Sequence, residues 1–213
     1  MDENAKSIMN IKFNKVKKEL EKRRFLCDIV EDASEARNLI TELIPVNASV
    51  SLGGSVTLTE TRILKQLYEM DIRLQDRYQE GLSEDERKDV LREAFTSDIF
   101  VTSTNALTMQ GELYNIDATG NRVAAMAFGP KKVIVVVGQN KLVSNIEEAE
   151  NRLRSIAAPM NCTRLNRKTP CTISGECMDC LSEERLCANF VRMGISYPKH
   201  RVHIILIKED FGY

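Results

Sequence analysis

The sequence predicts an α/β fold of three layers around a mostly parallel sheet, with a cysteine-rich segment before the last strand. Short apolar runs alternate with segments of helical periodicity along the chain. The stretch VIVVV at residues 133–137 is apolar throughout, which is typical of a central strand covered on both faces. A length of 213 residues with 43% hydrophobic content suits one domain with a substantial core. We therefore predict a single domain over residues 1–213 that includes a cysteine-rich segment at residues 162–187.

Helix-start signals separate the strands of the first half of the chain. An N-terminal helix is expected to end near Arg24. Patterns of a small polar residue followed three positions later by Glu indicate capping boxes, in which side chains satisfy the free N–H groups of the first turn. The predicted strands are residues 25–30, 48–52, 72–74 and 99–102, and the predicted helices between them are capped at Asp32, Thr57 and Ser83.

The helix capped at Ser83 carries an apolar face. Its spacing predicts that Val90, Leu91, Ala94 and Phe95 point into the core.

The second half continues the same alternation after the central strand. A helix is expected to start at Ser144, with Glu147 completing its capping box, and to run to about Ala158. Pro159 is expected to end that helix, because proline has no N–H to continue it. Residues 202–207 supply one more buried strand.

The charge balance excludes some classes of partner. The chain has 30 basic and 31 acidic residues, so no global field favours nucleic acid. No apolar run approaches the roughly 20 residues of a membrane span. The N-terminus MDENAKSIMN lacks the apolar region of a secretion signal, so we predict a cytoplasmic protein in which disulfides are not expected.

Four cysteines lie within seventeen positions in a C-x5-C-x2-C-x6-C spacing: Cys171, Cys177, Cys180 and Cys187. Clustered thiolates bind zinc or an iron–sulfur cluster, so we predict a metal site here. The spacing matches no standard ferredoxin or zinc-finger string. The alternative is a set of free buried thiols, the interpretation that suits Cys27, and Cys162 is a reserve ligand upstream.

The strand at residues 48–52 leads into Gly53, Gly54 and Ser55 and then into a predicted helix. Glycines let a backbone approach a ligand closely and adopt angles that other residues avoid. The first turn of a helix offers unpaired N–H groups to an anion. We therefore expect a phosphate or carboxylate at this turn, with an ordinary tight turn as the alternative, since neither dinucleotide-binding nor Walker A spacing is met.

Polar side chains also follow the strand predicted at residues 99–102. In open α/β sheets the C-terminal ends of the strands form the ligand crevice. Thr104, Asn105 and Thr108 are therefore expected to lie near the Gly53 turn.

Two cations complete the predicted ligand site. Arg122 either clamps a ligand carboxylate or pairs with Asp117. Lys141, in the loop after the central strand, is either offered to the same crevice or solvated.

Several long strings in the chain resemble the LUD domain of lactate-utilisation proteins. They read SLGGSVTLTE, TSTNALTMQGELYNIDATGNRVAAMAFGPKKVIVVVGQNK, KTPCTISGECMDCLSEERLC and RVHIILIKEDFGY, and the likeness covers roughly residues 15–213. The resemblance implies a fold similar to ribose-phosphate isomerase, glucosamine-phosphate deaminase and the CoA transferases. In those relatives the turn that corresponds to Gly53, Gly54 and Ser55 holds phosphate or an acyl carrier. The ferredoxin-type cysteine strings of the larger iron–sulfur subunit of the lactate-oxidising complex are absent here.

Two hypotheses follow, and neither assigns a catalytic residue. The first is a component of lactate or 2-hydroxyacid utilisation, which binds a small carboxylate or phosphorylated ligand and passes electrons through an iron–sulfur cluster to redox partner subunits. The second is an isomerase- or transferase-like enzyme, or a ligand sensor, in which zinc at the cysteines is structural.

Overall fold

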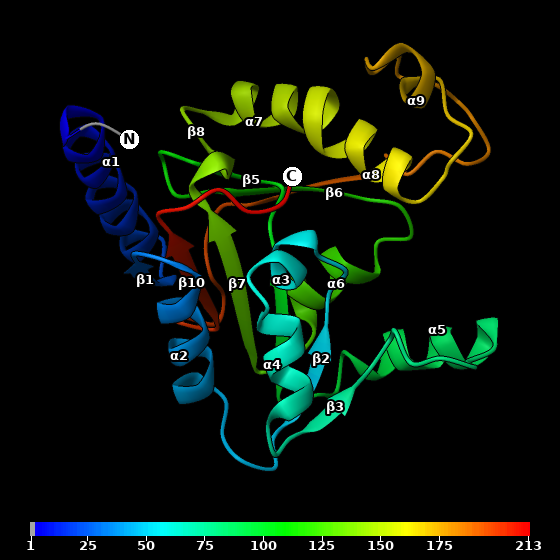
Figure 1. Ribbon diagram of the computed structural model, residues 1–213, viewed down its shortest axis with the longest axis horizontal. Coiled ribbons are helices and arrows are strands. Elements are labelled where there is room, and N and C mark those ends of the chain that lie inside the picture. Colours follow the sequence, from blue (N-terminus) through cyan, green and yellow to red (C-terminus); the bar gives the residue numbers. More distant parts are fainter. Residues whose placement is uncertain (1–2) are drawn as a thin grey trace.

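The computed structural model describes residues 3–213, and it confirms the three-layer α/β fold. The middle layer is a six-stranded sheet in which every neighbouring pair is parallel (Figure 1). Its strands, in spatial order, are β1 (Leu26–Val30), β10 (Val202–Ile207), β7 (Lys132–Gly138), β4 (Ile99–Ser103), β2 (Ser49–Leu52) and β3 (Arg73–Gln75).

Strand β7 shows how the sheet separates two cores. Val133, Val135 and Val137 pack with α1 (Glu3–Lys22) and α6 (Asn121–Phe128). The alternate residues Ile134 and Val136 pack in the other core, with α2 (Ala33–Leu43) and α4 (Ile63–Glu69). Because side chains alternate across a strand, a fully apolar run is needed to fill both layers.

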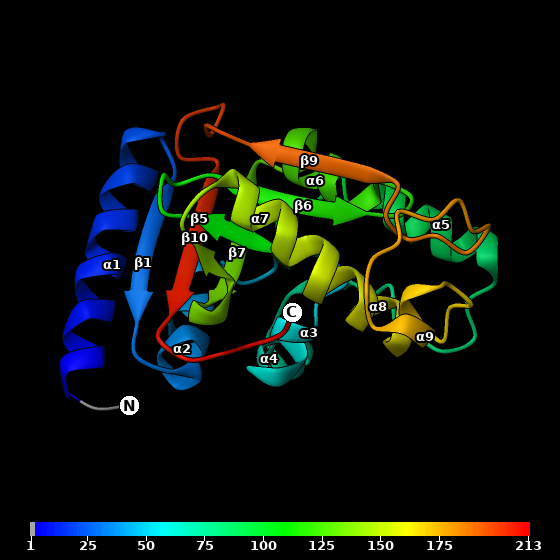
Figure 2. The ribbon, with the colours of Figure 1, turned by 90° about the horizontal axis from the view of Figure 1, so that it is seen from above.

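A second sheet of four strands lies across the carboxyl edge of the first (Figure 2). Its strands are β8 (Leu142–Val143), β5 (Ala106–Thr108), β6 (Leu113–Asp117) and β9 (Asn189–Met193). Helix α7 (Ile146–Arg152) packs on it through Ala149. This layer closes over the end of the parallel sheet where the ligand crevice of an open α/β fold lies.

Two predicted helix caps are displaced within the chain. Ser55, not Thr57, caps α3 (Val56–Glu60), because Thr57 is turned inward and fully buried. Asn145, not Ser144, caps α7, and its side chain accepts from the N–H of Glu148. Capping depends on which side chain reaches the free N–H groups, and neighbouring polar residues compete for that place.

The prediction that Pro159 ends a helix is wrong. The helix continues from α7 through a π-helical turn (Leu153–Ala157) into α8 (Ala158–Arg164), and Pro159 lies in the first turn of α8. In a π turn the backbone hydrogen bonds span five residues instead of four, so the hydrogen-bond pattern of the helix shifts by one residue. This shift occurs just before Pro159, which has no N–H to donate. Cys162 is carried on the continued helix and is buried.

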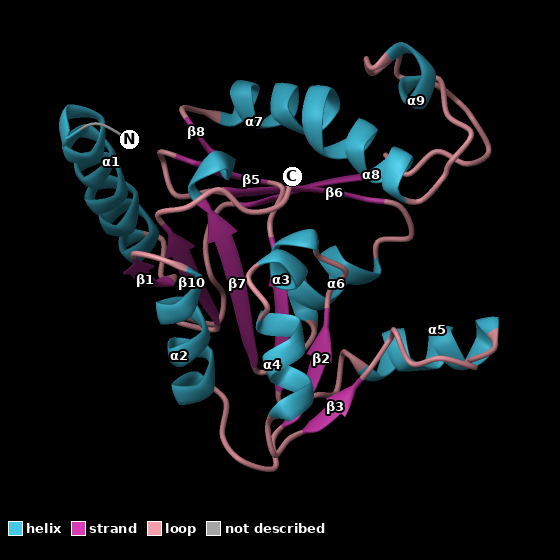
Figure 3. Cartoon of the chain, in the orientation of Figure 1, coloured by secondary structure: helices cyan, strands magenta, loops and turns pink. Residues whose placement is uncertain are grey.

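Helix α5 (Glu84–Glu93) contradicts the predicted apolar face. It has no buried residue, and it projects beyond the edge strand β3 (Figure 3). Val90 and Leu91 are only half-buried, Phe95 is 36% exposed, and Ala94 alone is buried as expected. The helix projects away from the parallel sheet, so the core does not cover its apolar side chains.

None of the helices in residues 3–213 has the length and apolar character needed to cross a bilayer.

Candidate ligand-binding site

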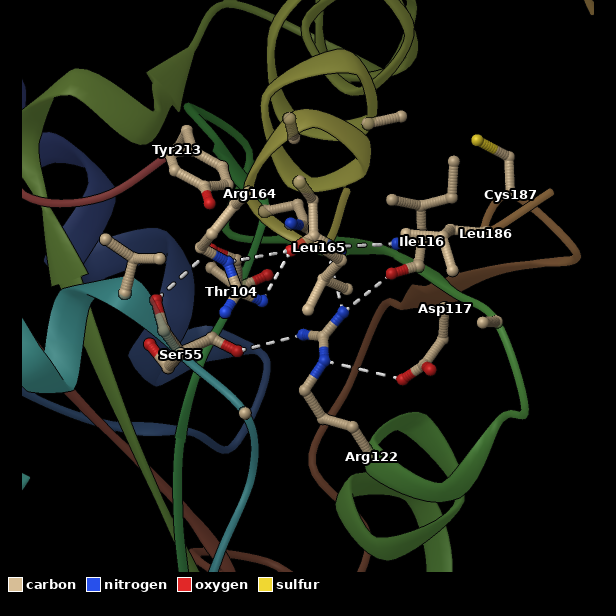
Figure 4. A pocket seen from close by; sticks show the side chains of 18 of the residues that line it. Ser55, Thr104, Ile116, Asp117, Arg122, Arg164, Leu165, Leu186, Cys187 and Tyr213 are labelled. Carbon is tan, nitrogen blue, oxygen red and sulfur yellow. Dashed lines mark hydrogen bonds and ion pairs between the residues drawn. The ribbon is translucent and has the colours of Figure 1, made fainter. Parts of the chain in front are cut away.

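A cavity of about 250 Å³ opens at the carboxyl edge of the parallel sheet (Figure 4). The turn after β2, the loop after β4, the start of α6, helix α8 and the C-terminal residue surround it. We call it the carboxyl-edge cavity. Its polar and charged lining includes Gly54, Ser55, Arg77, Ser103, Thr104, Asn105, Asp117, Arg122, Lys141, Arg164, Arg167 and Tyr213.

The structure brings six of the eight predicted ligand residues to this cavity: Gly54, Ser55, Thr104, Asn105, Arg122 and Lys141. The other two do not line it. Gly53 is buried beneath the turn, and Thr108 is buried in β5, where its hydroxyl accepts from the N–H of Glu112.

Gly53 is needed for space, and neither glycine of the turn is needed for unusual backbone angles. Neither lies in the positive-φ region, so the expectation of glycine-only angles is wrong. A Cβ atom on Gly53 would lie 2.2 Å from Oγ1 of Thr102. At Gly54 the nearest atom would be Nη1 of Arg77, at 3.4 Å. Gly53 lets β2 approach β4 closely, whereas Gly54 faces the cavity.

Ser55 caps a helix that is too short for a strong dipole. Its hydroxyl accepts from the N–H of Leu58 at 3.4 Å, and α3 ends after five residues. Arg62, in the left-handed region, separates α3 from α4. Because the macrodipole grows from aligned peptide units, a helix of five residues carries only a weak partial charge at its N-terminus.

The guanidinium N–H groups of Arg122 bond to other groups of the protein. Its Nη1 donates to the carbonyl of Ser103 (3.1 Å) and to Oδ1 of Asn115 (2.7 Å). Its Nη2 donates to Oδ1 of Asn105 (2.9 Å) and to the carbonyl of Ile116 (2.8 Å). Its Nε lies 3.4 Å from the carboxylate of Asp117 (Figure 4). Arg122 therefore holds the loops together and has no free fork for a ligand.

Other cations of the cavity have no carboxylate counter-ion among the described residues. Within the described part of the chain, no carboxylate pairs with Arg77, Arg164 or Arg167. Arg77 lies over the ring of Tyr78, 5.6 Å from its centroid, and Arg164 donates to the amide oxygen of Asn161. These guanidinium groups leave the cavity with excess positive charge.

Lys141 is the most buried cation of the cavity, with 2% of its surface exposed. It ends the short 3-10 helix η1 (Gln139–Lys141), and its Nζ bonds to Oγ1 of Thr57 (2.7 Å) and to Oγ of Ser103 (3.0 Å). Burial, together with the charges of Arg152 and Arg122, lowers the pKa of Lys141 to about 7. A substantial fraction of the amine is therefore neutral at pH 7. The sequence suggested a solvated loop lysine, and the structure contradicts that alternative.

Five of the six cysteines line a second, smaller cavity of about 20 Å³. We call it the thiol cavity, and it is bounded by Cys162, Cys171, Cys177, Cys180 and Cys187. Cys162 comes from α8 and Cys171 begins α9 (Cys171–Ser174). Cys187 lines both cavities, so the two sites are neighbours.

Burial and neighbouring thiols raise the pKa of two thiols of this cavity, Cys162 and Cys187. Burial, together with the charges of Cys162, Cys177 and Cys171, raises the pKa of Cys187 to about 11. Burial also raises the pKa of Cys162, with Cys171 adding to the effect. Among residues 3–213, no three cysteine, histidine or acidic side chains are arranged as a preformed metal site. Metal binding here would require the thiols to move toward one another.

The sequence model of the LUD domain matches residues 13–207. The chain belongs to the LUD-domain family. The LUD domain is similar in structure to a DUF162 family protein from Deinococcus radiodurans, with a TM-score of 0.54 and 14% sequence identity. That match covers 93% of this chain and 98% of the other, and at such identity it supports the fold alone. Comparison with curated proteins gives no match.

Sequence reasoning missed several residues that line the two cavities of this LUD domain. Arg77, Arg164, Arg167 and Tyr213 come from segments far from the glycine turn, and nothing in their local pattern marks them. Cys162 had a weak signal, its position upstream of the other cysteines, and the continued helix α8 places it beside them.

Proposed function

We propose that this LUD domain binds a small carboxylate or phosphorylated ligand in the carboxyl-edge cavity, as a component of lactate-type 2-hydroxyacid utilisation. The observation that carries the proposal is that three guanidinium groups line one cavity, those of Arg77, Arg164 and Arg167, and that no carboxylate of the described residues pairs with them. Like charges that converge without counter-ions cost free energy, and an anion removes that cost. Family membership supports the link to lactate utilisation.

The size of the cavity limits the ligand. Its volume of about 250 Å³ is below the roughly 300–1,000 Å³ typical of pockets for drug-sized molecules. A three- or four-carbon acid, or a small phosphate ester, fits a cavity of about 250 Å³ better than a nucleotide cofactor does.

Titration calorimetry with L-lactate and with inorganic phosphate tests this proposal. Arg77→Met and Arg164→Met are expected to weaken binding about tenfold or more, because each removes one charge-assisted contact. Arg92→Met is the matched control, since Arg92 lies on the projecting helix α5 and pairs with Asp89. Equal affinity in all four proteins, or no binding to the wild type, would contradict the proposal.

We further propose that the thiol cavity binds a metal. Support comes from the donor set, since five thiols border one small space, and soft metals prefer thiolates. A volume of about 20 Å³ is close to the space of one water molecule, roughly 10–15 Å³. This favours a single zinc ion over an iron–sulfur cluster.

Metal analysis of protein purified without oxygen separates the two metals. One zinc per chain without colour supports a structural site beside the ligand cavity. Stoichiometric iron and acid-labile sulfide would instead support an electron-transfer role with redox partner subunits. Metal-free protein after gentle handling would overturn the metal proposal.

A further inference from the structure

The side chain of Lys141 has an unusual set of partners for a buried cation. Both of its bonding partners are hydroxyls, Thr57 and Ser103, and within residues 3–213 no carboxylate forms an ion pair with it. A buried lysine kept as a structural cation is normally paired with an anion. These surroundings favour a neutral amine.

The directions of the hydrogen bonds show which part of that amine is free. The hydroxyl of Thr57 donates to the carbonyl of Phe211 (3.2 Å), and that of Ser103 has the carbonyl of Thr104 as acceptor (3.2 Å). Both hydroxyls therefore accept from Nζ. A neutral amine has two N–H groups and one lone pair, so these bonds use both N–H groups. The lone pair is left without a partner in the described part of the protein.

The C-terminal residues pass close to this amine on one side. A Cβ atom on Gly212 would lie 2.5 Å from Oγ1 of Thr57 and 3.3 Å from Nζ of Lys141, so only glycine allows the chain to cross here. Gly212 is held by Asn140, which donates to its carbonyl (2.7 Å), and by Glu60, which accepts from its N–H (2.6 Å). The amine is thus covered on one side while Lys141 lines the cavity on another.

Ser103 connects the amine to the rest of the site. Its carbonyl accepts from Arg122 while its hydroxyl accepts from Lys141. Arg122 and Lys141 are therefore fixed on the carbonyl and the hydroxyl of one residue, and the charge of Arg122 disfavours the ammonium form of Lys141. Arg152 acts in the same direction, and Glu60 opposes them.

We propose that Lys141 is a nucleophile that forms a Schiff base with the carbonyl group of a small anionic carbonyl compound bound in the carboxyl-edge cavity. The nitrogen attacks the carbonyl carbon, a C–N bond forms and the C–O bond breaks. The oxygen leaves as water carrying the two amine protons, and the imine nitrogen takes one proton from solvent. No oxidant or reductant is needed. The inference rests on the proposed anion site and adds a reactive group to it.

Reductive trapping tests the inference on the full chain. The protein is incubated with sodium borohydride and either pyruvate or glyceraldehyde 3-phosphate, so that carboxylate and phosphate probes are compared. Peptide mapping by mass spectrometry is expected to find the reduced adduct on Lys141 in wild-type protein. The trapping rate should rise through pH 7, whereas an exposed lysine reacts mainly near its ordinary pKa of about 10.4.

Lys132 supplies a matched control on β7, the strand that precedes Lys141. It lies at the opposite, amino end of β7, is half-buried, and donates to the carbonyl of Leu43 (3.2 Å). Lys132→Met should leave trapping unchanged, and Lys141→Met should abolish the specific adduct. If Lys141→Met fails to fold, the peptide map of the wild-type protein still shows whether the adduct is on Lys141.

The outcomes separate this inference from the proposed function. Calorimetric binding of L-lactate or phosphate without any Lys141 adduct would overturn the nucleophile and keep the anion site. Adducts spread evenly over surface lysines would also overturn it. Trapping at Lys141 in protein that does not bind L-lactate or phosphate would keep the nucleophile and contradict the anion site.

Discussion

Gly53 and Thr102 lie so close that a Cβ atom on Gly53 would be 2.2 Å from Oγ1 of Thr102 and 2.7 Å from its Cβ. Thr102 is fully buried in β4, and β2 pairs with β4 immediately before the turn. The approach of the two strands at the carboxyl edge therefore depends on the missing side chain.

Substitution of the two neighbouring glycines should separate a packing role from a cavity role. Gly53→Ala is expected to lower the free energy of unfolding by about 1–3 kcal/mol, because the new methyl group forces Thr102 to move. Gly54→Ala should change it by less than about 0.5 kcal/mol, since this residue is exposed and its nearest atom belongs to a flexible arginine. Urea denaturation of both variants provides the measurement, and equal losses would contradict the assignment.

Arg122 should behave as a structural residue. Arg122→Met is expected to destabilise the fold by about 3–5 kcal/mol, because it removes the partner of the half-buried Asp117 and four hydrogen bonds. Arg122→Lys should restore little, since an ammonium cannot reproduce the planar fork. Thermal unfolding checks both variants. A fully stable Arg122→Met protein would refute this role.

His203 should make stability depend on pH. Its Nε2 lies 2.7 Å from Oδ2 of Asp28, which ties β10 to β1. Burial lowers the pKa of His203 below its usual 6.5, and the carboxylate of Asp28 opposes this shift. The unfolded chain then takes up a proton first, so this stability is fully present above about pH 6.5 and is lost as pH falls toward the folded pKa. His203→Gln should flatten that part of the urea-measured pH profile, and an unchanged profile would contradict it.

Lys141 should act in a different pH range. Its pKa is lowered from 10.5 to about 7 in the folded protein. Above pH 7 the unfolded chain holds the additional proton, so the free energy of unfolding should rise with pH between about 7 and 8.5. Lys141→Met should remove this rise relative to the wild type. The difference between the two proteins is the relevant measurement, because other groups titrate near pH 9.

Cys162 should matter for metal content although it lies outside the dense cysteine motif. Cys162→Ser is expected to lower the metal per chain as much as Cys171→Ser, because both thiols border the same cavity. Cys27→Ser is the matched control, since Cys27 is buried elsewhere in the sheet and burial raises its pKa to about 12. Full metal content in Cys162→Ser would exclude the thiol of α8 as a ligand.

The parallel sheet could be predicted because its strands are continuous apolar runs and its helices have local start signals. Residues 133–137 and 202–207 correspond to β7 and β10 within one or two residues at each end. The second sheet was harder to predict, because β8 and β5 have only two and three residues and because β9, one of the two antiparallel partners of β6, is about seventy residues away. Local periodicity carries no information on such a distant pairing.

The amino-acid sequence by itself determined the fold class, the family, and the turn and loop residues that meet at the carboxyl edge, because strand composition and short motifs are local properties. Only the tertiary structure decided the charge states and roles within the site. In the folded chain the N–H groups of Arg122 donate to acceptors of the protein, and Lys141 is buried next to two hydroxyls. Cys162 lies beside the other thiols. Burial, counter-ions and hydrogen-bond partners come from segments remote in the chain, and these set how an ionisable side chain behaves.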